Sequence, residues 1–419
     1  MTQGIRRSLL QFIFSGAFLL RWNDKLRPTE LMEIDKQAHK MLIACILWHT
    51  QAEHLDSKTQ IALARDIIEG GLFDYFYRLI ITDIKPPVFY RIKENRADYE
   101  QLTEYVLSKL HPFFAPPSSA DTQSFWERMC VWHRSTETDT PARRILNAAH
   151  LFASHWEFSL IRPLNFFDDE MDEIESSFQK DLERFVDLPA MSSIRAPKTA
   201  LGRLASLAGQ LRFQIRWTRI PRIPLTAVLG HMFLVAVFSY LYSLSIQACQ
   251  ARCNNNFFCG LFHDLPEVLT RDIISPVKSS VPNLPSIIKK YEEDALERLI
   301  FTPLRKEGHQ ALVDQIAFYL GLSLGSEFSE CLRSNGIIQK VPDFTTLHSS
   351  YNADIYDPKD GALIKICDTL AAFLETHNSI QTGVSSPKLV AAYVKMKNTL
   401  ANNALASCLH LDSLMADFD

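Results

Sequence analysis

One stretch of the sequence occurs twice without a gap, once in each half of the chain. Residues 71–88 read GLFDYFYRLIITDIKPPV, and residues 260–277 read GLFHDLPEVLTRDIISPV. The apolar positions, one Asp and the closing Pro-Val agree between the two segments. Agreement in both spacing and apolar pattern is typical of a duplicated structural unit, so the chain is expected to fold as two copies of one unit.

Two further landmarks occur in the same order in both halves. Arg21-Trp22 precedes His39 much as Arg216-Trp217 precedes His231, and residues 145–151 resemble residues 363–369. The polar, Pro-containing stretch around 191–199 falls between the copies. We therefore predict two tandem helical domains, residues 1–190 and residues 200–419.

Composition favours an all-α fold for both domains. The 419 residues are 47% hydrophobic, which is enough for two cores of ordinary size. Glycine is scarce, at 14 residues. Long apolar-periodic runs are punctuated by prolines rather than by the alternating strand pattern with Asn-Gly or Asp-Gly turns.

The charge balance limits the classes of ligand. With 44 basic and 48 acidic residues, the formal net charge is −4. This balance gives no electrostatic footprint for duplex nucleic acid, and no basic track of the kind that oligonucleotide cleavage requires. A small anionic substrate held by a local basic cluster remains compatible with it.

The cysteines and the long apolar segments indicate in which cellular compartment the protein is expected to fold. The eight cysteines occur singly, without Cys-x-x-Cys, so a reducing cytoplasm is expected. Residues 6–20 imitate a signal peptide but lack a small-residue cleavage site. Residues 225–246 have nearly the length of a membrane span, yet they carry His231 and several serines. We predict a buried core helix there and no membrane partner.

Four side chains in the second half form a candidate metal site. Adjacent His263 and Asp264 put an imidazole and a carboxylate within an otherwise apolar segment, where an unpaired carboxylate would be costly. His231 and Asp368 also interrupt apolar helical runs. Each of these two alone could be a satisfied core histidine or half of a structural ion pair. Glu267 follows the His-Asp pair by one helical turn and faces the same space.

The order of a His, a His-Asp pair and a distant Asp resembles the HD (His-Asp) superfamily of metal-dependent phosphohydrolases. The second half looks like its bacterial deoxynucleoside 5′-monophosphatase branch over about residues 209–377. The resemblance is carried by Arg216-Trp217, Gly230-His231, Phe262-His263-Asp264, Glu267-Val268-Leu269-Thr270, Asp272, Pro276-Val277-Lys278, Ile366-Cys367-Asp368 and the following Ala371-Ala372-Phe373-Leu374. Two departures stand out: a Gly precedes His231 where a Glu or similar residue is usual, and residues 279–351 are longer than expected.

The resemblance implies one divalent metal ion held by His231, His263, Asp264 and Asp368. The mixed nitrogen and oxygen ligands leave its identity open among Mn, Co, Fe, Ni, Zn and Mg. The resemblance also implies roles for the remaining site residues. Glu267 would orient and deprotonate the attacking water, and Asp272 would protonate the leaving oxygen or hold the sugar. Arg216 would bind the phosphate, Trp217 would pack on the sugar or base, and Lys278 would add a positive charge. Arg216 and Trp217 could instead be a surface ion pair and a core aromatic, since the first half repeats them.

The leading functional hypothesis is a (deoxy)nucleoside 5′-monophosphatase. A dNTP triphosphohydrolase or a cyclic-nucleotide phosphodiesterase is the enzymatic alternative, and a non-catalytic nucleotide sensor or scaffold is the alternative of another class. In the first half the ligand positions read Asp74-Tyr75, Arg78 and His150, so this copy is expected to be degenerate and without a cation site. The chain is expected to be a monomeric pseudo-dimer or a homodimer.

Overall fold

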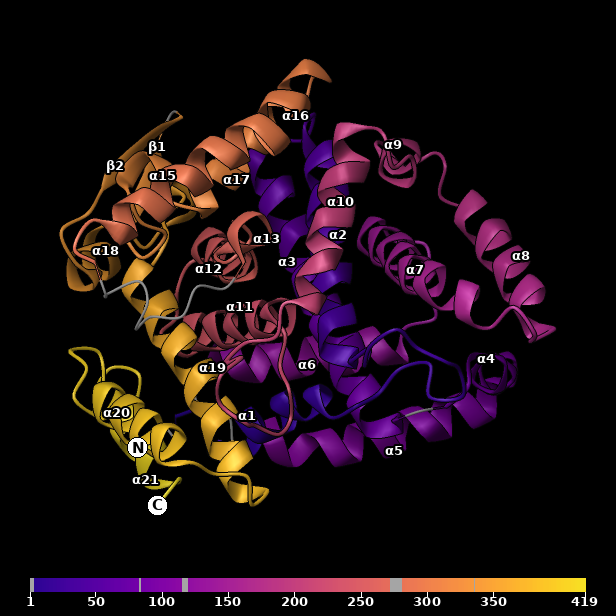
Figure 1. Cartoon of the computed structure of the whole chain (residues 1–419), viewed down its shortest axis with the longest axis horizontal. Helices are drawn as coiled ribbons and strands as arrows, with labels where there is room; N and C mark the ends of the chain where they lie inside the picture. Colours follow the sequence, from indigo (N-terminus) through magenta and orange to yellow (C-terminus); the bar gives the residue numbers. More distant parts are fainter. Residues whose placement is uncertain (1–3, 83, 115–119, 272–280, 335) are drawn as a thin grey trace.

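The computed structural model describes residues 4–82, 84–114, 120–271, 281–334 and 336–419 (Figure 1). These residues are mostly helical, as the sequence predicted. The first half contains α1 (Arg7–Phe14), α2 (Glu33–Ala52), α3 (Ser57–Ile81), α4 (Pro86–Glu94), α5 (Arg96–Phe114), α6 (Ala120–Arg134), α7 (Pro141–Ile161), α8 (Glu170–Glu183) and α9 (Met191–Arg195). The second half contains α10 (Ala200–Gln210), α11 (Val228–Ser245), α12 (Gln250–Phe262), α13 (Glu267–Thr270), α15 (Leu284–Leu296), α16 (Thr302–Lys306), α17 (Gln310–Tyr319), α18 (Phe344–Ser350), α19 (Gly361–Gln381), α20 (Pro387–Ala401) and α21 (Leu411–Ala416).

Short helical turns link these elements. Turns of 3-10 helix span Ser15–Ala17, Arg162–Leu164, Leu211–Phe213, Leu322–Leu324 and Asp354–Tyr356, and a π-helix spans Glu297–Phe301. Several long helices begin at a side chain that accepts a hydrogen bond from the first turn. Asp56 caps α3, Thr140 caps α7, Thr199 caps α10 and Ser386 caps α20. Each cap satisfies a backbone N–H that would otherwise lack a partner, and so fixes where the helix starts.

A two-stranded hairpin is the exception to the predicted all-α fold. Strand β1 (Cys331–Ser334) pairs antiparallel with β2 (Ile337–Lys340), within the unfamiliar 279–351 segment. The hairpin is anchored because Cys331 is buried and exchanges backbone hydrogen bonds with Lys359. Gly336 in the connecting turn has a φ of +77°, a conformation that favours glycine.

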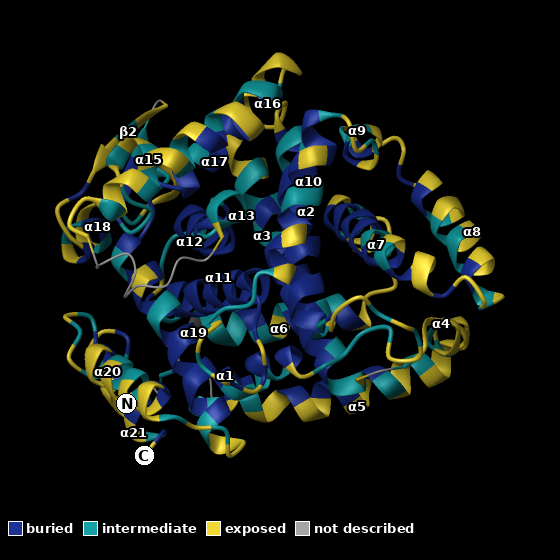
Figure 2. Ribbon diagram, in the orientation of Figure 1, coloured by how far each residue is buried: buried dark blue, intermediate teal, exposed yellow. Residues whose placement is uncertain are grey.

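Helices α2 and α11 form the centre of the molecule (Figures 1 and 2). Helix α11 packs against α2, α12 and α19, and α2 also contacts α3 and α7. By length and composition α11 could span a membrane, with a mean hydropathy of 1.6, but 94% of it is buried inside the protein. It is therefore a core helix, as expected for this run of the sequence.

The two halves share one hydrophobic core. A single cluster of buried apolar side chains extends from Leu9 in α1 to Leu414 in α21 and includes both central helices. The predicted boundary, residues 191–199, includes α9, but the core is continuous across the halves because α2 and α11 pack directly against each other. The domain limits 1–190 and 200–419 stay a prediction.

The closest approach of α2 and α11 explains one departure noted in the sequence. A Cβ at Gly230 would lie 2.7 Å from Asp35 Oδ1 and 2.9 Å from Ile34 Cγ2. A larger residue before His231 would therefore collide with α2. The glycine allows the two central helices to cross closely at the residue next to His231.

Candidate metal centre

Three potential metal ligands converge from three different helices. His231 lies in the first turn of α11, His263 follows the last residue of α12, and Asp368 lies in the middle of α19. One ligand atom from each side chain lies within 4.8 Å of the other two. His231 Nε2 is 3.0 Å from Asp368 Oδ1, and the two imidazole centroids are 5.5 Å apart. The structure thus brings together three residues that are far apart in the sequence.

His263 is oriented for ligation through its Nε2 atom. Its Nδ1 lies 2.8 Å from the Gly260 carbonyl oxygen, which can only accept a hydrogen bond, so Nδ1 carries a proton. Nε2 faces Asp264, with 3.1 Å between Nε2 and Oδ2. A backbone carbonyl that fixes the tautomer in this way is the usual support of a metal-bound histidine.

The carboxylates of the cluster stabilise a proton on His263, at the position where a metal ion would bind. Burial lowers the pKa of His263, but the neighbouring Asp264 and Asp368 carboxylates override this effect and raise the pKa to about 9. Burial likewise raises the pKa of Asp368, whereas hydrogen bonding to His231 and the charge of Lys365 hold it well below its usual value. The cluster therefore favours positive charge at its centre, and this donor set fits a divalent cation.

Asp264 connects the cluster to a basic side chain. Its Oδ2 lies 3.6 Å from Arg216 Nη1, and the Asp264 side chain is 20% exposed. Arg216 is mostly buried, and its Nε lies 3.3 Å from Glu375 Oε1. The guanidinium therefore lies at the edge of the cluster, between two carboxylates.

Glu375 is a site residue that the sequence analysis missed. It is fully buried on α19, about two turns after Asp368, and so lies on the same side of that helix. Trp217 Nε1 donates to Glu375 Oε2 over 2.7 Å, and Thr226 Oγ1 donates to Oε1 over 2.8 Å. Despite burial, the charges of Arg216 and Arg222 hold the pKa of Glu375 well below its usual value. A carboxylate in the apolar 370–374 neighbourhood was the signal that could have identified it.

The structure describes only some of the residues that were predicted to bind or act on the substrate. Arg216 and Trp217 lie together as expected, and both contact Glu375 and line a surface pocket of about 440 Å³. Glu267 begins α13, and its carbonyl oxygen accepts from Gln214 Nε2 over 3.0 Å. Asp272 and Lys278 lie outside the described residues.

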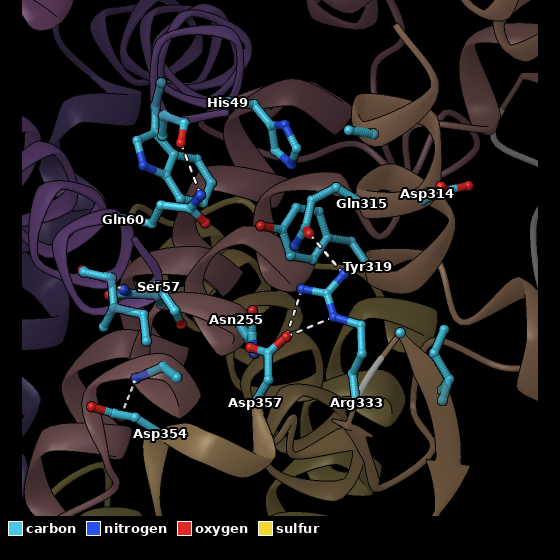
Figure 3. A pocket seen from close by; sticks show the side chains of 18 of the residues that line it. His49, Ser57, Gln60, Asn255, Asp314, Gln315, Tyr319, Arg333, Asp354 and Asp357 are labelled. Carbon is cyan, nitrogen blue, oxygen red and sulfur yellow. Dashed lines mark hydrogen bonds and ion pairs between the residues drawn. The ribbon is translucent and has the colours of Figure 1, made fainter. Parts of the chain in front are cut away.

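A second cavity, of about 750 Å³, lies at the other end of α12 (Figure 3). Its charged lining consists of one guanidinium, Arg333, and four carboxylates: Glu53, Asp314, Asp354 and Asp357. Arg333 is already paired with Asp357, with 2.7 Å between Nε and Oδ2. Burial lowers the pKa of His49, which also lines the cavity, to about 4, so this imidazole is neutral at pH 7. The excess of negative charge disfavours a phosphate-bearing substrate in this cavity.

Two buried imidazoles, a pair of carboxylates and an adjacent guanidinium define a site for metal-assisted hydrolysis of phosphate esters. Residues 208–397 match the family described as HD domain. No curated protein and no solved structure matches the chain at a significant level. The second half of the chain therefore contains an HD domain, and its buried His231, His263 and Asp368 cluster fits the divalent metal that such domains use. This domain and its ligand cluster support metal-dependent phosphohydrolase chemistry in residues 208–397.

Proposed function

We propose that the HD domain is a (deoxy)nucleoside 5′-monophosphatase that releases inorganic phosphate. The observation that carries this proposal is the convergence of His231, His263 and Asp368 within 4.8 Å, beside Asp264 and Arg216. Arg216 supplies a fork of donors that suits a terminal phosphate dianion better than an internal diester. The likeness of the 260–277 segment to the monophosphatase branch supports the same substrate class.

Four residues would hold the metal: His231, His263, Asp264 and Asp368. Nε2 of His263 has its lone pair available once the shared proton leaves, because Nδ1 is bound to the Gly260 carbonyl. When bound, the divalent ion would polarise the phosphate and lower the pKa of a coordinated water. Metal binding and loss of the His263 proton are coupled, because only the neutral imidazole can ligate.

The other residues of the chain would bind the phosphate and move protons. Arg216 Nη1 lies next to the metal ligand Asp264, so a phosphate at the metal would meet the guanidinium. We propose that Glu267 accepts the proton of the attacking water. Trp217, fixed by Glu375, would limit the space for the sugar or base. Asp272 and Lys278 keep their proposed roles of protonating the leaving oxygen and adding a positive charge.

A phosphate-release screen tests the substrate class. Purified protein, freed of metal and then supplied with each candidate ion, is assayed on nucleoside mono-, di- and triphosphates and on cyclic nucleotides. We expect release from 5′-monophosphates, and loss of both metal and turnover in His263→Ala/Asp264→Ala. Turnover of triphosphates or cyclic nucleotides alone would replace the monophosphatase proposal, and nucleotide binding without turnover would favour a sensor.

We further propose that residues 1–190 are a degenerate copy of the HD domain. Several local features recur in both halves at corresponding positions. Trp22 and Trp217 both have a positive φ, of 54° and 60°, and so do Thr82 and Arg271, with 53° and 67°. The isolated bridge Leu20–Met32 recurs as Ile215–Ala227. Trp22 Nε1 donates to Glu157, as Trp217 Nε1 donates to Glu375. Tryptophan rarely adopts a positive φ, so its recurrence inside a loop closed by a matching bridge supports common descent.

These recurring features change one correspondence drawn from the sequence. The bridge Leu20–Met32 lies over Ile215–Ala227, which places Lys36, rather than His39, at the position of His231. The same comparison places His150 at the position of Asp368, and Lys36 Nζ lies 2.5 Å from His150 Nδ1. A lysine and a histidine at these two positions lack the carboxylate that Asp368 would supply, so they do not reproduce the mixed donor set of the second half. We therefore expect one metal ion per chain by elemental analysis, unchanged in His39→Ala; two ions per chain would contradict a degenerate first half.

A further inference from the structure

The cavity of about 750 Å³ at the N-terminal end of α12 lies apart from the metal centre (Figure 3). It is bounded by the end of α2, the starts of α3 and α12, α17 and the β1–β2 hairpin, and we call it the α12 cavity. A volume of this size accommodates a small organic molecule. Asn255 in its wall precedes His263 by eight residues, about 12 Å along a helix axis. A ligand in the α12 cavity would therefore leave the metal centre open.

Three carboxylates that line the α12 cavity have no compensating cation. They belong to Glu53, Asp314 and Asp354. None of the three forms an ion pair with any residue that the structure describes. The other two charged groups of the described lining, Arg333 and Asp357, neutralise each other, with 2.7 Å between Nε and Oδ2. Three negative charges therefore remain for a ligand.

Arg333 is held in the wall of the α12 cavity by three contacts, so it offers little opposition to a cation. Besides its pair with Asp357, its Nη1 donates to Gln315 Oε1 over 2.8 Å. Its guanidinium carbon also lies 4.5 Å from the centroid of the Phe318 ring. Figure 3 shows the guanidinium between Gln315 and Asp357. Its charge is therefore used within the protein.

Asn255 adds a hydrogen-bond acceptor without a partner. Only 5% of the residue is exposed, and its Nδ2 donates to Asp357 Oδ1 over 2.7 Å and to the Pro358 carbonyl over 3.1 Å. Both of these oxygens accept, so the orientation of the amide is fixed. Within the described ranges of the chain, no donor reaches Asn255 Oδ1. Because an acceptor in a mostly buried side chain is poorly hydrated, an N–H donor in the α12 cavity would be stabilised there.

The free carboxylates of the α12 cavity do not converge on one point. In the part of the chain that the structure describes, the only three potential metal ligands within 4.8 Å of one another are those of the metal centre. Figure 3 shows Asp314 and Asp354 on opposite sides of the Arg333–Asp357 pair. Separated charges suit a ligand with several cationic groups better than a single metal ion. The lining also includes apolar side chains, such as Ile338, against which methylene groups can pack.

We propose that the α12 cavity binds an extended organic cation that carries two or more amino groups, the chemistry of an aliphatic polyamine. Glu53, Asp314 and Asp354 would pair with its ammonium groups, and Asn255 Oδ1 would accept a hydrogen bond from one of them. The methylene segments would pack on the apolar part of the lining. None of these residues belongs to the metal centre, so the proposal does not depend on which substrate the HD domain hydrolyses.

Equilibrium dialysis of radiolabelled spermidine against the full-length, metal-free protein tests this site. Physiological ionic strength screens exposed charges beyond about 8 Å and so suppresses diffuse attraction. We expect one saturable site per chain. The double variant Glu53→Gln/Asp314→Asn, which keeps the side-chain shapes, should weaken binding by about tenfold or more, the scale of a lost charge-assisted hydrogen bond.

A second variant and a matched control locate the site. Ala311 is exposed on α17 and lines the α12 cavity, so Ala311→Arg places a competing guanidinium there and should weaken binding as strongly. Glu127→Gln is the control, because Glu127 is exposed on α6 and, like Asp314, accepts a hydrogen bond from a glutamine four residues earlier. This control removes one negative charge outside the α12 cavity and should bind spermidine as wild type does.

The outcomes separate the α12 cavity from other sources of binding. Circular dichroism verifies that each variant is folded. The monoamine n-butylamine should bind at least about tenfold more weakly than spermidine, since one ammonium can pair with only one of the separated carboxylates. Equal affinity for the two amines, no saturable binding, or unchanged binding in both folded cavity variants would overturn the proposal. So would binding that is lost in His263→Ala/Asp264→Ala, because the cation would then lie at the metal centre.

Discussion

Replacing Asp35 with Asn should stabilise the protein at neutral pH. Asp35 lies where α2 crosses α11, with only 4% of the residue exposed. Burial raises the pKa of its carboxyl to about 7, although the charge of Arg212 opposes this rise. Because the folded pKa lies above the ordinary value of 3.8, the unfolded chain loses this proton first, and stability falls as the pH rises toward 7.

The shift of about 3 pKa units corresponds to roughly 4 kcal/mol in total, of which about 3 kcal/mol is lost between pH 5 and pH 8. Asn has nearly the same shape and no charge, so Asp35→Asn should avoid this loss. Urea unfolding of both proteins at pH 5, 6, 7 and 8 measures the difference. The free energy of unfolding of the variant relative to wild type should rise by about 3 kcal/mol over this range. Asp172→Asn, at a side chain that is 88% exposed, serves as the control. A difference that stays constant from pH 5 to pH 8 would refute the reasoning.

Three further predictions concern buried charge and turnover. Glu375→Gln removes the charged partner of Arg216 and should lower the free energy of unfolding by about 3 kcal/mol, measured by urea denaturation; an unchanged midpoint would contradict the role of Glu375 as a brace. Arg252→Met leaves Asp360 as an unpaired buried carboxylate, since both side chains are fully buried, and should cost about 3–5 kcal/mol. Adding Asp360→Asn should recover part of this loss, and a double variant no more stable than the single one would argue against the charge explanation. Glu267→Gln should retain the metal by elemental analysis and lose phosphate release; wild-type turnover would remove Glu267 from the mechanism.

The convergence of the metal ligands could be predicted from local sequence, because His231, His263 and Asp368 each interrupt an apolar helical run. Burial of a polar group requires a partner, and these three become one another's partners. Glu375 escaped the prediction because its partners, Arg216 and Trp217, come from a loop that only the tertiary structure brings to α19.

Two other features were not predicted. The β1–β2 hairpin was missed although the sequence has Asn335-Gly336, a dipeptide typical of hairpin turns, between the two short strands. The proposed correspondence of Lys36 with His231 was missed because the sequence comparison matched histidine with histidine and so selected His39. His39 instead lies in the core, with its Nε2 2.9 Å from the Ala205 carbonyl oxygen.

Helix α19 holds Asp368 and Glu375 on one rigid rod, so a metal ligand and the support of the Arg216-Trp217 segment cannot move independently. The opposite side of this rod packs against α20, whose Val390 and Val394 are exposed at 42% and 47%. A displacement of α20 would shift α19, and with it both Asp368 and Glu375. Such a shift should therefore change the Asp368 ligand and the support of the Arg216-Trp217 segment together, whereas His231 and His263 lie on other helices.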